Sequence, residues 1–93
     1  MNNHPLVRAL KAIEPEAVFT LISSREWRSM TFAGQQLVIE RVAASTANFE
    51  QLARSLPNHE FSLPKMLVAD ISVAVSGDAE GARMLIEALI IDE

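Results

Sequence analysis

The most apolar part of the chain lies near its end, where residues 67–91 read LVADISVAVSGDAEGARMLIEALII. Two apolar runs, residues 67–75 and 82–91, flank a turn-like stretch that contains two glycines. The second run also suits a helix, because it is rich in Ala, Leu, Met and Glu. A hairpin centred between Asp78 and Ala79 explains more of the pattern, since it sets apolar residues of both runs opposite one another on one face. The predicted pairs on that face are Val75 with Ala82, Val73 with Met84, Ile71 with Ile86, Ala69 with Ala88 and Leu67 with Ile90.

The opposite face of this hairpin mixes large apolar side chains with charged ones. Together with Trp27 from an earlier segment, its apolar members are Met66, Val68, Leu85, Leu89 and Ile91. A sheet face that is turned to water does not normally carry so much apolar surface. We expect a second copy of the chain to cover it, because closed two-fold dimers are the commonest soluble oligomers. The dimer can be face to face or edge to edge, and a different protein partner is the alternative occupant.

The predicted register places Asp70 directly opposite Glu87 on the same face. Two carboxylates so close can share a proton or bind a divalent cation. They can equally be neutralised by Arg83, by Arg41 or by an arginine of a partner chain. A lone pair of acids has no third ligand, so we predict no metal site.

Two further residues, His59 and Glu60, lie in a loop and form the other candidate acid/base pair. Neither of the two histidines has a second histidine one helical turn away, and the glycines fit turns and do not form a phosphate-binding loop. No serine stands in a Gly-x-Ser-x-Gly motif. We therefore predict no catalytic residue and no cofactor.

The remaining elements follow from apolar spacing. Leu6, Leu10 and Ile13 share one helical face, and Pro15 ends that helix. Residues 17–22 are branched and aromatic, as strands are. Ser45 or Thr46 caps a second helix, which ends before Pro57 and is followed by a loop over residues 57–64. The buried stripe of that helix is Phe49, Leu52, Ala53 and Leu56, and Phe61 and Leu63 of the loop plug the edge of the core.

Residues 23–33 are compatible with two structures. Ser23 and Glu26 have the spacing of a helical capping box, with Gly34 as the terminating glycine. Alternatively, residues 27–33 and 36–43 form a hairpin whose turn is Gly34-Gln35. The hairpin pairs Phe32 with Leu37, Met30 with Ile39, Thr31 with Val38 and Trp27 with Val42, and this agreement favours it.

These elements predict an α+β fold, a two-layer sandwich of antiparallel hairpins with two helices on one face and the order α-β-β-β-α-β-β. Residues 1–4 are expected to be a disordered start and residues 5–93 a single domain. A chain of 93 residues has room for one core only.

Composition limits the function classes. The chain has no cysteine, which excludes disulfides, thiol nucleophiles and thiolate zinc sites. Its formal net charge is −4, and its bases are scattered singly, so nucleic acid and membrane surfaces are not expected partners. No segment has the pattern of a signal peptide or a membrane span. The cytoplasm is the expected compartment.

Three segments stand out in order, WRSMTFAG at residues 27–34, LPNHEFSLP at 56–64 and LVADISV at 67–73. In that order they resemble a family of short uncharacterised alphaproteobacterial proteins, in which a TF-G hairpin precedes a helix, an LP-HEF-LP loop and an LVAD strand. The resemblance covers about residues 27–93. It implies the same order of elements and a strand at the end, and it implies no activity. The recurring Asp and His-Glu of that family correspond here to Asp70 and to His59 and Glu60.

The leading hypothesis is thus a non-enzymatic homodimeric or partner-binding module that uses the second face of its sheet. The alternative is a small-ligand or metal-binding protein, or an enzyme, with a site at a dimer groove around Asp70, Glu87 and His59. Asp70 and Glu87 paired with arginines would favour the first hypothesis. The same acids lining a concave pocket with His59 would favour the second.

Overall fold

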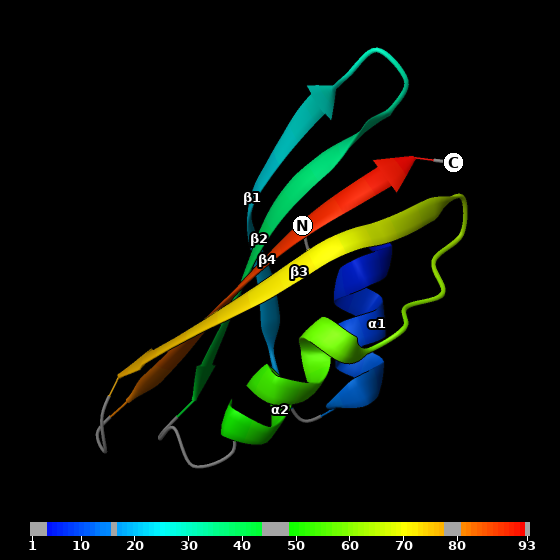
Figure 1. The fold of residues 1–93 in the computed structure, drawn as a ribbon. Helices are drawn as coiled ribbons and strands as arrows, with labels where there is room; N and C mark the ends of the chain where they lie inside the picture. The colour runs from blue at the N-terminus through cyan, green and yellow to red at the C-terminus, as the bar shows by residue number, and fades with distance from the viewer. Residues whose placement is uncertain (1–3, 16, 44–48, 78–80, 93) are drawn as a thin grey trace.

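The computed structural model describes residues 4–15, 17–43, 49–77 and 81–92. Two α-helices and a short 3-10 helix accompany one antiparallel sheet of four strands in the order β1-β2-β4-β3 (Figure 1). The elements are α1 (Pro5–Ile13), β1 (Phe19–Arg28), β2 (Ala33–Ala43), α2 (Phe49–Ser55), the 3-10 helix η1 (Leu56–Asn58), β3 (Met66–Gly77) and β4 (Ala82–Asp92). The predicted fold class, α+β with antiparallel hairpins, is confirmed.

The predicted order of elements is also found, with its first two strands joined. The strand predicted at 17–22 and the start of the one predicted at 27–33 belong to the single strand β1, which continues through a bulge between Leu21 and Ser23. The helical alternatives for residues 23–33 and for residues 82–91 are wrong, because residues 23–28 lie in β1, residues 29–32 in the turn that follows it, and residues 82–91 in β4.

The turn of the first hairpin lies four residues earlier than predicted, at Met30-Thr31 in place of Gly34-Gln35. Ser29 closes it, since its backbone N–H donates to the Phe32 carbonyl at 2.8 Å and its Oγ accepts from the Phe32 N–H at 3.0 Å. The predicted pairs of Trp27 with Val42 and of Phe32 with Leu37 are therefore wrong. Trp27 pairs with Gly34, and the side chains of Met30 and Phe32 are exposed near the tip.

The second hairpin is in place, but its register differs from the predicted one by two residues. β3 continues to Gly77, which pairs with Ala82, so the centre of the turn lies one residue later than predicted. Gly77 has a φ of 121°, which side-chain-bearing residues rarely adopt, and this allows the chain to turn there. From Ile71 onward, a shift of two residues keeps each side chain on its predicted face, because strand side chains alternate with a period of two.

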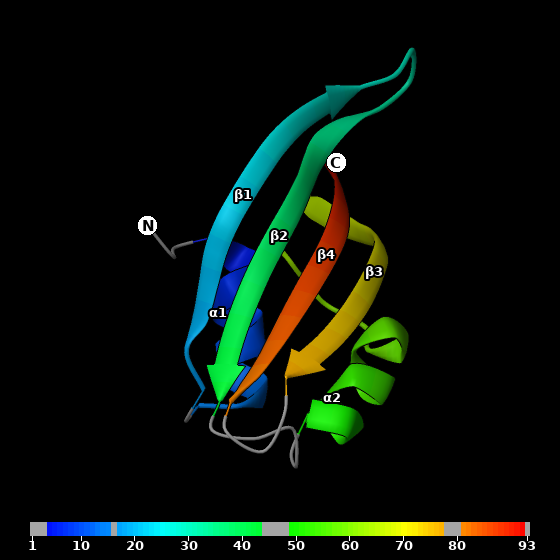
Figure 2. The ribbon, with the colours of Figure 1, turned by 90° about the vertical axis from the view of Figure 1, so that its left-hand side faces the viewer.

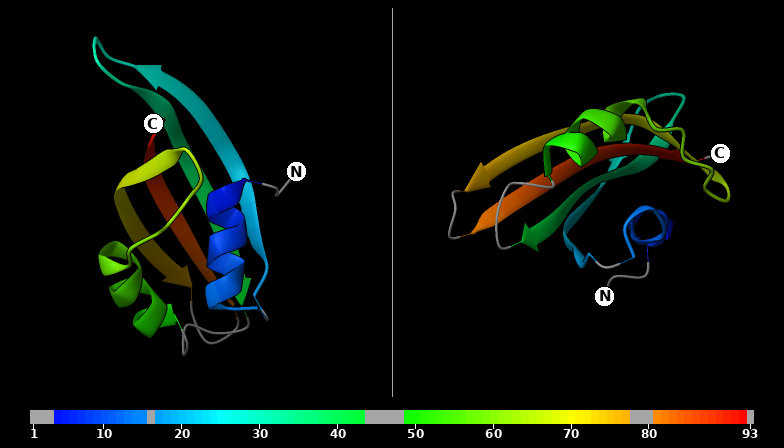
Figure 3. Two further views of the ribbon diagram at one scale, coloured as in Figure 1. Left: turned by 90° about the vertical axis from the view of Figure 1, so that its right-hand side faces the viewer. Right: turned by 90° about the horizontal axis from the view of Figure 1, so that it is seen from below.

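The core lies between the two helices and one face of the sheet. From α1 it takes Leu6, Val7 and Leu10, from α2 and η1 Leu52 and Leu56, and from the sheet Phe19, Leu37, Ile39, Ile71, Ala82, Met84, Ile86, Ala88 and Ile90. Phe61 and Leu63 pack against its edge as predicted. Figure 2 shows the sheet with α1 behind it, and Figure 3 shows both helices from the opposite side.

Polar contacts fix α1 at both of its ends. His4 is the N-cap: its Nδ1 accepts the N–H of Leu6 at 3.0 Å, and its Nε2 lies 3.0 Å from Gln35 Oε1. His4 therefore belongs to the folded domain and not to a disordered start, while residues 1–3 lie outside the described part of the chain. At the other end, Arg41 of β2 pairs with Glu14 at 2.7 Å.

Neither helix in the described ranges is both long enough and apolar enough to span a membrane.

Candidate functional site

The sheet face that α1 and α2 do not cover is here called the helix-free face. Strand pairing arranges its side chains in rows that cross all four strands from β1 to β3. The rows are Trp27, Gly34, Ile91 and Leu67; then Arg25, Gln36, Leu89 and Asp70; then Ser23, Val38, Glu87 and Ser72; then Thr20, Glu40, Leu85 and Ala74.

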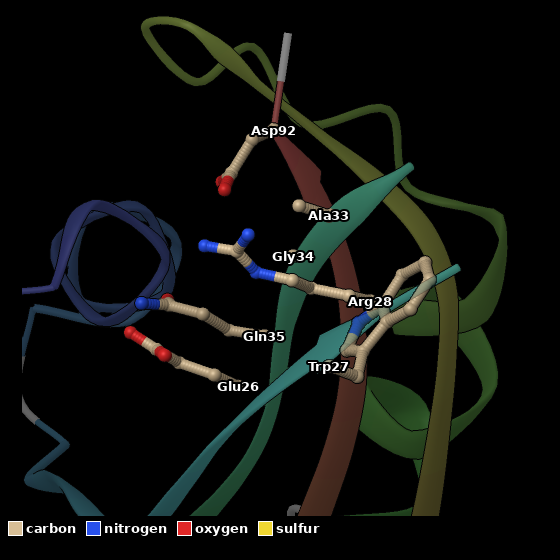
Figure 4. Close-up of a pocket in the computed structure, with 7 residues that line it drawn as sticks. All are labelled: Glu26, Trp27, Arg28, Ala33, Gly34, Gln35 and Asp92. Carbon is tan, nitrogen blue, oxygen red and sulfur yellow. The ribbon is translucent and has the colours of Figure 1, made fainter. Parts of the chain in front are cut away.

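The first row is apolar from one edge of the sheet to the other. A Cβ on Gly34 would lie 1.8 Å from the Ile90 carbonyl oxygen, so a side chain at this position would force β2 and β4 apart. Trp27 occupies the adjacent position on β1 and points away from Arg28 and Gln35, to the helix-free side (Figure 4). Its indole Nε1 is buried, and it has no hydrogen-bond partner among the described residues.

Apolar side chains continue into the following rows. Leu85, Leu89, Ile91 and Val38 are half-buried by their neighbours on the sheet. Leu67 is 49% exposed and Val42, beyond the fourth row, is 64% exposed. Four of the predicted members of this face, Trp27, Leu85, Leu89 and Ile91, therefore lie on it.

Met66 and Val68 do not belong to this face, and their assignment to it is wrong. Both pack against the core, on the helix side. A bulge between Val68 and Asp70 adds one residue to β3 and reverses the alternation of side chains before it. Leu67, which was predicted to be in the core, lies on the helix-free face for the same reason.

Asp70 and Glu87 share the helix-free face but are not opposite each other. Asp70 pairs with Leu89 and Glu87 with Ser72, so the two acids are diagonal neighbours. The backbones of such neighbours are about 7–8 Å apart in a regular sheet. They line an open depression of about 200 Å³ with Gln36, Ser72, Ala88 and Leu89. The like-charge repulsion between them is consequently weaker than the predicted direct opposition implies.

The arginines of the described chain do not neutralise this acid pair. Arg83 pairs with Glu40 on the neighbouring strand, and Arg41 pairs with Glu14 on the helix side. Asp70 Oδ1 accepts the N–H of Ile71 at 3.0 Å, next to the bulge. Arg25 lies in the same row as Asp70 on the opposite edge of the sheet, and among the described residues it has no ion-pair partner.

The second candidate pair, His59 and Glu60, is separate from these acids. Both residues are exposed in the loop after η1, and neither lines the depression. The His59 ring contacts Phe61 edge-on, with ring centroids 4.5 Å apart, and Phe61 packs against the core. The structure thus does not bring His59 to Asp70 and Glu87, and within the described ranges no three His, Cys, Asp or Glu side chains are placed to hold a metal ion.

A second, smaller pocket lies on the helix side at the end of the sheet near the first hairpin, and the sequence interpretation missed it. Glu26, Arg28, Gln35 and Asp92 line it together with Trp27, Ala33 and Gly34 (Figure 4). Its volume is about 70 Å³. Ligand pockets are typically about 300–1,000 Å³, so it holds a few waters at most. Its charged residues come from strand ends far apart in the sequence, and no local pattern joins them.

Comparison with protein-family models, with curated proteins and with solved structures finds no match to this chain.

Proposed function

We propose that the protein is a non-enzymatic, homodimeric or partner-binding module that associates through its helix-free face. The observation that carries this proposal is the apolar row of Trp27, Ile91 and Leu67, extended by Leu89 and Leu85, on a face without a helix over it. Contiguous apolar surface with a polar surround is typical of protein interfaces.

Trp27 has the properties of an interface anchor. Tryptophan is enriched among the residues that dominate binding energy, because it buries a large area and keeps one donor for a specific hydrogen bond. The Trp27 side chain as a whole is only half-buried in the single chain, so a bound protein can cover the rest of the ring.

The structure of the two outer strands favours association through the helix-free face over association through an edge of the sheet. Both outer strands, β1 and β3, contain a bulge, between Leu21 and Ser23 and between Val68 and Asp70. Bulges on outer strands interrupt the straight row of hydrogen-bonding groups that a further strand would need. The proposal therefore favours face-to-face over edge-to-edge association.

Substitution of Leu89 by Lys tests the proposal, because it places a charge in the second row of the face. We expect the wild-type chain to have twice its 10.2 kDa mass by light scattering at micromolar concentration, and the variant to be monomeric. Ser24→Lys is the matched control, since Ser24 is exposed and lies on the helix side of β1. A wild-type chain that is monomeric throughout would overturn the homodimeric form of the proposal, and a dimer that Leu89→Lys leaves intact would overturn the helix-free face as its contact surface.

Trp27 provides a second readout. It is the single tryptophan of the chain, so its fluorescence reports on the helix-free face alone. If that face is covered on association, quenching by acrylamide should increase as the wild-type protein is diluted. The Leu89→Lys variant should show the higher quenching at every concentration.

The acid pair favours a second candidate function, the binding of a small cationic ligand or divalent ion. Asp70 and Glu87 line a depression and lack arginine partners in the described chain. The depression is open and smaller than ordinary ligand pockets, and His59 is not part of it. An increase in melting temperature with millimolar calcium, magnesium or manganese, lost in Asp70→Asn, would support this candidate.

Two broader assignments also remain proposals. We place the module in the cytoplasm, where a small domain without disulfides is ordinary. We also group it with the short alphaproteobacterial proteins that it resembles, a grouping that carries no activity with it.

A further inference from the structure

We propose that the occupant of the helix-free face is a second copy of the chain, packed face to face about a two-fold axis parallel to the strands, with Arg25 of each copy against the partner's Asp70 and Glu87. This inference rests on the proposed function and adds to it the identity of the partner and the orientation of the two sheets.

Charge placement is the first argument. Arg25 on β1 and Asp70 on β3 lie in one row at opposite edges of the sheet. A two-fold axis that runs parallel to the strands between β2 and β4 places each β1 over the partner's β3. Each residue of β1 then lies over the residue of the partner's β3 that belongs to the same row. Arg25 then lies over the partner's Asp70, at both edges of the interface. Packed sheets are rotated by about 30°, and the long arginine side chain accommodates the resulting offset.

The same arrangement places the partner's Arg25 where it can neutralise Asp70 and Glu87. Glu87 lies on the strand next to Asp70 and one row further along, so one arginine above the pair can contact both carboxylates. Arginine suits this role because its guanidinium has five donors in a fixed plane. Each copy contributes one unpaired arginine and receives the partner's, while Glu40 and Arg83 are already paired within the chain.

Shape complementarity in the first row is the second argument. The axis places Ile91 of one copy over Gly34 of the other, so a protruding side chain meets the one position of that row without a side chain. It also places Trp27 over the partner's Leu67, which is 49% exposed in the single chain. Apolar contacts thus occupy one end of the interface and the charged pairs lie in the next row.

A two-fold arrangement about an axis across the strands through the third row is unfavourable. Such an axis would place Glu87 directly over the partner's Glu87. It would also place Arg25 over the partner's Thr20, which carries no charge. Like charges placed against each other are unfavourable, so the arrangement parallel to the strands is preferred over this one.

The available area is enough for a stable dimer. Four strands spaced about 4.8 Å apart, each contributing about ten residues of about 3.3 Å, present about 600 Å² per copy, or about 1,200 Å² in total. Stable protein interfaces begin at about this total area.

Charge reversal at Arg25 tests the inference. We expect Arg25→Glu to weaken the dimer at least about tenfold, because it replaces two attractive contacts with two repulsive ones. Asp70→Arg should do the same, and the double variant R25E/D70R should recover an affinity within about threefold of the wild type. Dissociation constants are measured by sedimentation equilibrium, at low salt and at 0.5 M NaCl, where screening should reduce the effect to about threefold.

Two controls keep the result interpretable. Arg28→Glu makes the same charge change three residues along β1, on the helix side of the sheet (Figure 4), and should leave the dimer unchanged. Because Asp70 accepts a hydrogen bond at the bulge, R25E/E87R provides a second rescue that leaves this contact intact.

The outcomes separate the inference from the proposed function. A dimer that Leu89→Lys dissociates but that Arg25→Glu leaves unchanged would overturn the orientation and retain the face. A dimer weakened by Arg25→Glu with no rescue by either double variant would also overturn the pairing. A wild-type chain that never dimerises would overturn the inference and, with it, the homodimeric form of the proposed function.

Discussion

At the scale of single residues, Gly34 is the position where the structure leaves least freedom. Its Cα lies against the β4 backbone, so that even a methyl group would collide with the Ile90 carbonyl oxygen at 1.8 Å. Steric conflict with backbone cannot be relieved by a rotamer change, and the strands must move instead. The glycine therefore allows the close spacing of β2 and β4, and it leaves a position without a side chain beside Trp27.

Gly34→Ala should lower the free energy of unfolding by about 1–3 kcal/mol, measured by urea denaturation followed by circular dichroism. Gly81→Ala is the control, because a Cβ there has no heavy atom within 4 Å. We expect the control to change stability by less than about 0.5 kcal/mol. Equal effects at both glycines would show that the close approach of β2 to β4 does not exist.

At the scale of secondary-structure elements, the bulge in β3 decides which residues are core. It turns Val68 to the helix side and Leu67 to the helix-free face. Regular alternation over residues 66–75 would give the opposite assignment for these two neighbours, and that is the assignment the sequence pattern predicts.

Substitution of these neighbours by Asp distinguishes the two assignments. Val68→Asp should lower the free energy of unfolding by about 2–3 kcal/mol, because the carboxylate meets the core edge. Leu67→Asp should cost less than about 1 kcal/mol in a Leu89→Lys background, where no dimer contributes. Urea denaturation of both variants provides the comparison, and the reverse ranking would place the bulge elsewhere.

The second hairpin could be predicted from the sequence in part. The alternation of residues 71–75 and 82–90 survives an error of two residues in register, so the core face of the second hairpin was predicted correctly. The bulge between Val68 and Asp70 has no side-chain signature, and Met66 and Val68 were therefore misplaced.

The first hairpin was harder to predict, because the glycine at position 34 is not at the turn. Gly34 is required by close packing against β4, while the turn is held by Ser29, a residue common throughout proteins. At the candidate site, Trp27, Leu85, Leu89 and Ile91 could be grouped from their alternation. Arg25 could not, since its row with Asp70 exists only once β2 and β4 are paired.

At the scale of the whole molecule, folding and association should be coupled. A dimer that forms only from folded chains stabilises the folded state increasingly as protein concentration rises. We therefore expect the thermal unfolding midpoint of the wild-type protein to rise by a few degrees for each tenfold increase in concentration. The Leu89→Lys variant should have a midpoint independent of concentration, and scanning calorimetry at three concentrations distinguishes the two. A wild-type midpoint that is also constant would contradict the coupling.

The bulges in β1 and β3 have a consequence for how far assembly can proceed. Fibrils grow by adding straight strands to an outer strand, one chain after another. Here each outer strand is kinked, and only the face between them is suited to contact. If the chain pairs through its helix-free face as proposed, assembly should stop at a closed pair, because the bulges disfavour the addition of further strands at either edge.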